Sequence, residues 1–358
     1  MGYSSSITFF KIGENMDTNY TLDLLKKLLS IDSPTGYTKE AIAFLNAEAI
    51  RLGYETSITN KGNLLVEIAG KNNEEALGVC AHVDTLGLMV KSIKANGRLS
   101  FTTIGGIQLN TLDGEYCRII TRDNKVYTGT ILSNSSSSHV YKNAESLARN
   151  IDNMEVVIDE VVKNKDDVLK LGISNGDFIA VDTKTTICDS GYIKSRFLDD
   201  KLSVAGLFGL LKDLKETGDS PKHKTYFMVT TYEEVGHGNS YIPSDITSLL
   251  GVDMGCIGAD LTCTELDVSI CAKDSSGPYD YEMTSSLISL AKENNLSYAV
   301  DIYPMYGSDV SAALRGGNDI RGALIGPGVA SSHGMERSHI DALISTMTLI
   351  KEYMLKGK

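Results

Sequence analysis

The order of helix-like and strand-like segments constrains the fold of this chain more than any other feature. Residues 18–85 have the pattern of two amphipathic helices followed by two apolar strands. From residue 190 onward, helices alternate with strands up to a closing helix near Ile340. Strands that alternate with helices are typical of a mainly parallel sheet covered on both faces. We therefore expect an α/β fold built on a mainly parallel, doubly covered sheet.

A β-rich segment interrupts this alternation between residues 87 and 189. Asn96-Gly97 and Asp123-Asn124 each stand between two strand-like runs, which is the pattern of a β-hairpin. A single short helix, KDDVLKLG, precedes the strand-like run DFIAVDT. We therefore predict a small inserted domain, a β-barrel or sandwich of PDZ-like type.

The predicted domain organisation follows from these two patterns. The larger α/β domain comprises residues 17–86 and 190–358, and the β-rich insert comprises residues 87–189. Hairpins with open edges expose unpaired backbone groups, so we expect the insert to pair with a symmetric copy as a dimerisation domain. We assign no role to residues 1–16.

Composition excludes several classes of partner. The net charge of −12 disfavours nucleic acids and acidic membrane surfaces, because both attract basic proteins. The six cysteines show no CxxC spacing, which is typical of buried thiols in a reducing compartment. No uncharged apolar run approaches the roughly 18 residues that span a bilayer, and the N-terminus lacks the features of a signal peptide. We therefore expect a cytoplasmic protein with neither a nucleic-acid nor a membrane partner.

A group of histidines and acids stands at the ends of predicted strands or in loops on the same side. Its members are His82, Asp199, Glu233, Glu234, Asp253 and His333. Ligands bind at the carboxyl edge of open α/β sheets, so we expect these side chains to converge there.

The residue types in this group indicate a metal site. Two imidazoles and several carboxylates, without a thiolate pair, suit divalent zinc, cobalt or manganese. Three carboxylate ligands and a bridging hydroxide would balance the charge of two divalent cations. Successive side chains of a strand point to opposite faces, so Glu233 and Glu234 can serve one site only if the backbone turns between them. With such a turn, the two carboxylates could take different roles in the same reaction. Glu234 could then bind a metal while Glu233 acts as a base for metal-bound water.

Each signal taken alone has a simpler structural interpretation. Adjacent glutamates are usually an exposed acidic pair, and Asp199-Asp200 has the pattern of a helix N-cap. The other histidines are interpreted in this way and left out of the site: His139 as a loop residue, His223 as a solvated one and His339 as the start of the last helix. The convergence of the remaining acids and histidines on one sheet edge favours a functional site.

Six short motifs occur in the order and spacing of a known family. They are AHVDTLGLMV, FLDDKLSVAG, TTYEEVGHG, GVDMG, YGSDVSAAL and SSHGMERSH. Together they resemble the dinuclear metallo-aminopeptidases that form tetrahedral particles, a glutamyl-aminopeptidase-like family whose members are sometimes labelled endoglucanases. The resemblance extends from about residue 20 to the C-terminus and includes the inserted β-domain. It implies an enzyme with two divalent ions that acts on short peptides and assembles from dimers, up to a dodecamer.

The resemblance also implies which residues hold the metals. The ligands of one ion would be His82, Asp199 and Asp253. Those of the other would be Asp199, Glu234 and His333, with Asp199 as the bridge. The implied ions are Zn²⁺ or Co²⁺, with Mn²⁺ as the alternative.

Three further acids receive roles from the same resemblance. Glu233 would be the general base. Asp84 would contribute a carboxylate that fixes the tautomer of the His82 ring. Asp309, in YGSDVSAAL, matches an acid that the family keeps near the site.

The chain departs from the family pattern next to the predicted ligands. It has EEVGHGNS instead of EEVGLRG, DDKLS instead of DDR followed by a glycine, and HGMER instead of His-Ser-Pro. These differences leave every predicted metal ligand in place, but they do not indicate which substrate the enzyme prefers. The runner-up is a two-metal deacylase or carboxypeptidase-type hydrolase of N-acylated amino acids or dipeptides. A glycosidase is disfavoured because the chain has no tryptophan, and a non-catalytic binding protein because the base Glu233 is present.

Overall fold

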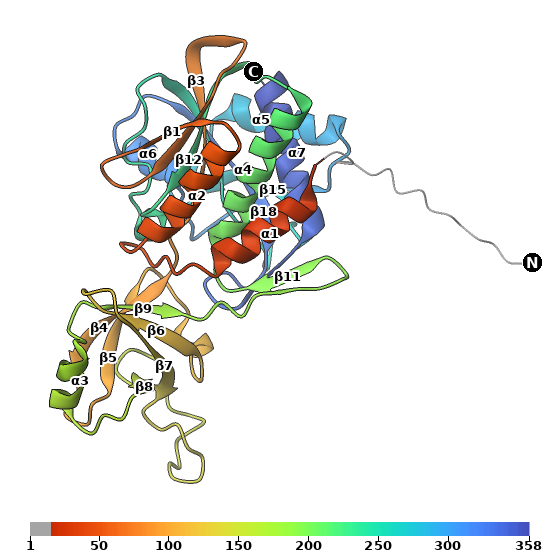
Figure 1. Cartoon of the computed structure of the whole chain (residues 1–358). Helices are drawn as coiled ribbons and strands as arrows, with labels where there is room; N and C mark the ends of the chain where they lie inside the picture. The colour runs from red at the N-terminus through yellow and green to blue at the C-terminus, as the bar shows by residue number, and fades with distance from the viewer. Residues whose placement is uncertain (1–15, 358) are drawn as a thin grey trace, which may run out of the picture.

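The computed structural model describes residues 16–357 of the chain. The unassigned segment, residues 1–16, lies outside this part apart from Met16. A large α/β domain carries a small β-barrel at one end (Figure 1). None of the helices within residues 16–357 combines the length and the apolar character needed to cross a membrane.

A sheet of ten strands forms the centre of the large domain. Across the sheet, the order is β1 (Glu55–Ile58), β2 (Leu64–Ile68), β12 (His223–Thr230), β3 (Asn72–His82), β13 (Ile246–Val252), β18 (Arg321–Val329), β15 (Val268–Asp274) and β16 (Gly277–Pro278). Two more strands lie off this path: β14 (Gly255–Cys256) pairs with β18, and β17 (Tyr298–Ile302) pairs with β15.

The four central strands, β12, β3, β13 and β18, run parallel to one another. β1 and β2 form an antiparallel pair, β2 runs antiparallel to β12, and β15 runs antiparallel to β18. The predicted parallel arrangement is therefore confirmed for the centre of the sheet. At the end of β3, His82 lies opposite Thr230 of β12. The loops that follow these two strands therefore leave the sheet at the same edge.

Helices cover both faces of the sheet, as expected, but unequally (Figure 1). One face packs against α1 (Thr18–Leu29), α2 (Lys39–Arg51), α4 (Leu198–Thr217), α5 (Tyr281–Glu293) and α7 (Ile340–Lys356). The other face carries the short helix α6 (Asp309–Arg315). Alternate side chains of β3 serve the two cores: Val79 and Ala81 face the larger helix layer, and Cys80 faces the core beneath α6.

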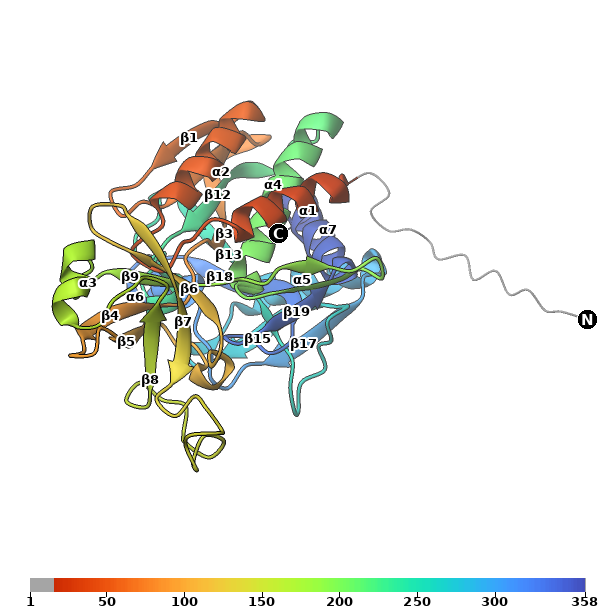
Figure 2. The same ribbon diagram turned by 60° about the horizontal axis from the view of Figure 1, so that its bottom comes forward.

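The inserted domain is a closed barrel (Figure 2). Around the barrel, the order is β4 (Gly87–Ile93), β5 (Leu99–Ile104), β8 (Met154–Ile158), β7 (Val126–Ser133), β6 (Tyr116–Ile120) and β9 (Phe178–Val181). Helix α3 (Lys165–Leu171) precedes β9. Both predicted hairpins are present, with left-handed backbone at Gly97 and Asn124 in their turns.

The expectation of open hairpin edges in the insert is wrong. β9 pairs with both β4 and β6 and so closes the sheet, which gives each of the six barrel strands a partner on both sides. The argument for dimerisation from unpaired backbone groups therefore does not hold.

A small three-stranded sheet joins the barrel to the large domain. It consists of β10 (Thr186–Ile187), β11 (Tyr192–Ser195) and β19 (Glu336–His339), so it connects the exit from the barrel with the segment before α7. The domain boundary expected between residues 189 and 190 falls in the turn between β10 and β11. The proposed domain limits stay a prediction.

Candidate metal centre

The predicted site residues come from the ends of several elements. His82 ends β3, Asp199 lies at the start of α4, Glu233 and Glu234 lie in the 3₁₀ helix η2 (Glu233–Val235) after β12, Asp253 follows β13, and His333 lies between β18 and β19. Because β3, β12 and β13 are parallel and adjacent, their carboxyl ends bring these side chains to one edge of the sheet. At the start of α4 the backbone of Asp199 and Asp200 is not helical, and the peptide bond between them is cis.

Asp199 lies between the two imidazoles. Its Oδ1 is 3.1 Å from Nε2 of His82, and its Oδ2 is 3.7 Å from Nε2 of His333. Each of these nitrogens also faces a second acid, with Glu233 Oε2 3.7 Å from His82 and Glu234 Oε2 3.8 Å from His333. Ligand atoms about 2.0–2.2 Å from one metal ion are about 3–4 Å from each other, so these spacings suit cations at both ends of Asp199.

Both imidazoles are held in the same tautomer. Nδ1 of His82 donates to the carbonyl oxygen of Asp84 at 2.9 Å, and Nδ1 of His333 donates to the carbonyl oxygen of Gly106 at 3.1 Å. A nitrogen that faces a carbonyl oxygen must carry the proton, so in neutral rings the lone pair lies on Nε2. In each histidine, Nε2 therefore presents an electron pair to the acid cluster, as metal ligation requires.

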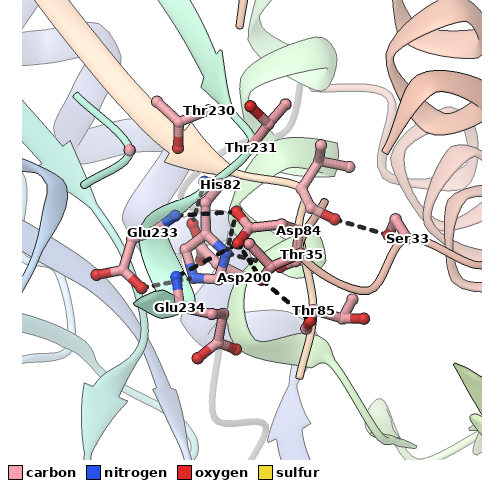
Figure 3. A network of polar contacts seen from close by, with 12 residues as sticks. Ser33, Thr35, His82, Asp84, Thr85, Asp200, Thr230, Thr231, Glu233 and Glu234 are labelled. Atoms are coloured by element: carbon pink, nitrogen blue, oxygen red, sulfur yellow. Dashed lines mark hydrogen bonds and ion pairs between the residues drawn. The ribbon is translucent and has the colours of Figure 1, made fainter. Parts of the chain in front are cut away.

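The Asp84 carboxylate has a different contact from the one expected. It lies 3.7 Å from His82 Nδ1, farther than the Asp84 carbonyl oxygen that binds the ring. Its oxygens instead accept hydrogen bonds from Thr35 Oγ1 at 2.7 Å and from the backbone N–H groups of Glu233 (3.1 Å) and Glu234 (3.3 Å) (Figure 3). Asp84 therefore holds the turn at which Glu233 is directed toward His82 and Glu234 toward His333.

The acid cluster opens into a cleft of about 700 Å³. Five of the predicted residues line it: Asp199, Glu233, Glu234, Asp253 and His333. His82 and Asp84 are buried behind this wall. Apolar side chains, Met254, Tyr306 and the exposed Met305, also line the cleft. The cleft thus combines an acidic wall with apolar surface.

Burial and mutual repulsion make the acid cluster unfavourable when it is fully ionised. Burial and the nearby acids raise the pKa of Glu233 and Glu234 well above the ordinary value and that of Asp253 to about 7. Burial also opposes charge on His82, but its hydrogen bond to Asp199 and the surrounding acids raise the pKa of that imidazole well above its usual range. Asp199 is buried as well, yet its hydrogen bond to His82 lowers its pKa.

The chemistry of the donor set fits divalent cations. Oε1 of Glu234 is buried without a hydrogen-bond partner, and a cation would satisfy such an atom. Two groups of side chains bring their ligand atoms within 4.8 Å of one another: His82, Asp199 and Glu234, and His82, Asp200 and Asp253. Asp200 was not among the predicted site residues. Its Oδ2 accepts the backbone N–H of His82 at 3.1 Å and it does not line the cleft, so we assign it to holding β3 in place.

Asp309 lies behind the site. Its carboxylate accepts hydrogen bonds from the Thr230 hydroxyl and from the backbone N–H of Asn239 at 2.9 Å, and it does not line the cleft. Burial raises its pKa to about 6. Asp309 therefore connects the end of β12 to the loop after Glu234.

The barrel contributes directly to the His333 side of the site. Besides the Gly106 carbonyl, Gln108 donates its backbone N–H to the His333 carbonyl and its Nε2–H to the Ser332 carbonyl, both at 3.0 Å. The sequence did not point to Gly106 or Gln108, because they lie in the insert, outside the six motifs and far along the chain from His333.

Residues 62–349 match a family described as M42 glutamyl aminopeptidase. The chain belongs to this M42 family. It is therefore a metal-dependent aminopeptidase, a hydrolase of peptide bonds. The resemblance that the six motifs indicate is confirmed.

Relatives cover nearly the whole chain. The protein of Bacillus subtilis (strain 168) named "Putative aminopeptidase YhfE" is 45% identical over 335 residues, which span 93% of this M42 chain and 97% of that protein. Two solved structures share the fold: Pyrococcus horikoshii TET1 peptidase (TM-score 0.81, 22% identity, 94% of this chain and 99% of that one) and the TET aminopeptidase of Thaumarchaeota archaeon SCGC AB-539-E09 (TM-score 0.85, 17% identity, 94% and 97%).

Chelator-treated protein should lose stability as the pH rises from about 4 to about 7. The pKa values of Glu233, Glu234 and Asp253 are raised in the folded state, so over this range the unfolded chain binds fewer protons and is favoured. Added Zn²⁺ should restore more stability at pH 8 than at pH 5. Thermal unfolding midpoints against pH, with and without Zn²⁺, measure both effects.

A matched pair of variants tests the origin of this loss. Asp253→Asn should flatten the fall with pH, whereas Asp23→Asn, at an exposed position on α1, should leave it unchanged. A midpoint that rises with pH in the chelator-treated protein would contradict this account of the cluster.

Proposed function

We propose that this M42 protein is a two-metal aminopeptidase that removes N-terminal residues from short peptides. The observation that carries the proposal is the position of Asp199, with one carboxylate oxygen facing each imidazole. His82, Asp199 and Asp253 would hold one ion, and Asp199, Glu234 and His333 the other. The ions are Zn²⁺ or Co²⁺, with Mn²⁺ as the alternative.

Bound ions would polarise the scissile carbonyl and lower the pKa of a coordinated water. In the proposed mechanism Glu233 takes a proton from the attacking water and later gives it to the departing amine. Two observations support this role. Glu233 lines the cleft, and its backbone N–H donates a hydrogen bond to the Asp84 carboxylate.

The proposed metal ions favour a substrate with a free amine. Four of the predicted residues that line the cleft are acids, Asp199, Glu233, Glu234 and Asp253. In the two-metal form the ions offset the charge of these acids, and the substrate nitrogen can itself contact a metal. A free amine has a lone pair that a metal can bind, whereas the nitrogen of an N-acyl group does not. This favours an aminopeptidase over the runner-up, a deacylase or carboxypeptidase-type hydrolase.

A substrate panel tests this choice. We expect the protein, supplied with Zn²⁺, Co²⁺ or Mn²⁺, to release free amino acids from short peptides and amino-acid anilides. It should leave the N-acetylated forms of the same substrates intact, because an acylated nitrogen has no free lone pair for a metal. Turnover of the acetylated forms alone would select the deacylase and overturn the proposal.

Replacing the base tests the mechanism. Glu233→Gln keeps the shape of the side chain but removes its basicity, so turnover should fall about 10²-fold or more. Metal content should stay at the native level, because the proposed ligands are intact. Glu282→Gln, at an exposed position in α5, is the matched control and should keep full turnover. A Glu233→Gln enzyme within a few-fold of native turnover would rule out Glu233 as the base.

We also propose a cytoplasmic homo-oligomer built from dimers, up to a dodecamer. The six cysteines are free, which supports a reducing compartment. The barrel exposes apolar side chains, among them Tyr116 and Val140, that a second copy could cover. The Pyrococcus horikoshii TET1 peptidase, which shares the fold, can assemble into a tetrahedron or a large octahedral shell.

Light scattering at micromolar concentration tests the assembly. We expect a mass several times the 38.7 kDa of one chain, because exposed apolar surface on the barrel favours association. A stable monomer under these conditions would contradict the proposed oligomer.

A further inference from the structure

Glu336 is a buried acid that the sequence did not single out. It begins β19, three positions after His333, and its side chain is 2% exposed. It does not line the cleft, so it is placed neither to touch a substrate nor to act as a base there. Its two carboxylate oxygens are nevertheless both engaged. Oε1 accepts the backbone N–H of His333 and Oε2 accepts the backbone N–H of Asp199, each at 3.0 Å.

These two N–H groups belong to distant parts of the chain. Asp199 lies at the start of α4, and His333 lies in the loop before β19. His333 has a φ of 65°, a left-handed conformation that a residue with a side chain rarely adopts without support from its surroundings. Asp199 has non-helical backbone angles in the first turn of α4. One carboxylate therefore holds two irregular backbone segments at a fixed separation.

The side chain of His333 has its own, separate support. Its Nδ1 donates to Gly106 of the barrel, which sets the rotation of the ring. Glu336 sets the position of the backbone that carries this ring. Because Asp199 Oδ2 and His333 Nε2 are only 3.7 Å apart, a small backbone shift on either side would change the space between them.

We propose that Glu336 is a positioning residue for the metal ion held by Asp199, Glu234 and His333. The inference rests on the proposed function, because it assumes that these side chains bind a cation. Glu336 is not placed to ligate the ion, because it does not line the cleft and both its oxygens face backbone N–H groups. It keeps the Asp199 carboxylate and the His333 imidazole at a spacing that one ion can bridge. Groups that orient ligands in this way are worth about 10- to 100-fold in metal affinity.

The simpler alternative is that Glu336 only ties β19 to α4 and contributes to folding. A matched control separates the two. Asp301, in β17, has the same chemistry away from the site: its Oδ1 accepts the backbone N–H of Thr262 at 2.8 Å, and its Oδ2 accepts that of Cys263 at 2.9 Å. It is also buried and does not line the cleft.

The test compares Glu336→Gln with Asp301→Asn. In each variant an amide NH₂ replaces one acceptor oxygen and faces a backbone N–H, so one hydrogen bond is lost. Zn²⁺ titration against a competing chelator gives the affinity of the first and second equivalents for each protein. The increase of the thermal midpoint with free Zn²⁺ gives a second measure that does not depend on activity.

For Glu336→Gln we expect the second equivalent of Zn²⁺ to bind about 10- to 100-fold more weakly than in the native protein. Activity should recover as Zn²⁺ is raised. Asp301→Asn should bind both equivalents with native affinity, whatever its stability. If Glu336→Gln does not fold, Glu336→Asp keeps the carboxyl group but is too short to reach both N–H groups, and the same loss of affinity is expected.

Two outcomes would overturn the inference in different ways. If Glu336→Gln binds both equivalents as tightly as the native protein and loses only stability, as Asp301→Asn does, Glu336 is structural and the proposed function is untouched. If the native protein itself binds fewer than two equivalents, the two-metal proposal fails and the inference fails with it.

Discussion

The repulsion among buried carboxylates at the edge of the sheet is the constraint on which the rest of this structure depends. Asp199, Glu233, Glu234 and Asp253 share one wall of the cleft with a single imidazole, that of His333. Buried like charges raise one another's pKa values and destabilise the fold when they ionise. Such a cluster is least favourable when it is fully ionised, and divalent cations supply the compensating positive charge compactly. The metal chemistry of the family and the stability of the fold are thus linked through the same side chains.

Backbone N–H groups position much of this cluster. Asp84 accepts the N–H groups of Glu233 and Glu234, Asp200 accepts that of His82, and Glu336 accepts those of Asp199 and His333. These three acids therefore bind the main chain of the site residues. The side chains of the site residues are left free to face the proposed metal ions and the cleft. Buried hydrogen bonds of this kind are costly to break, so this arrangement limits movement of the proposed ligands.

The barrel takes part in the site as well as in any assembly. Gly106 and Gln108 bind the loop that carries His333, and the buried Arg196, just before α4, donates to Thr111 of the insert and to the carbonyl of Gly334. The His333 loop is therefore held between the two domains. A displacement of the barrel relative to the large domain would reach this imidazole directly, which gives the insert a physical route to affect the site.

The sequence by itself determined the α/β pattern, both barrel hairpins and the convergence of His82, Asp199, Glu233, Glu234, Asp253 and His333, because periodicity and strand-end position are local properties. It could not determine closure of the barrel, which depends on β9 pairing with β4 and β6. Nor could it assign the roles of Asp84 and Glu336. Except for the bond from His333 to Glu336, those roles consist of hydrogen bonds to backbone groups far away in the chain, and only the tertiary structure decides which N–H group meets which carboxylate.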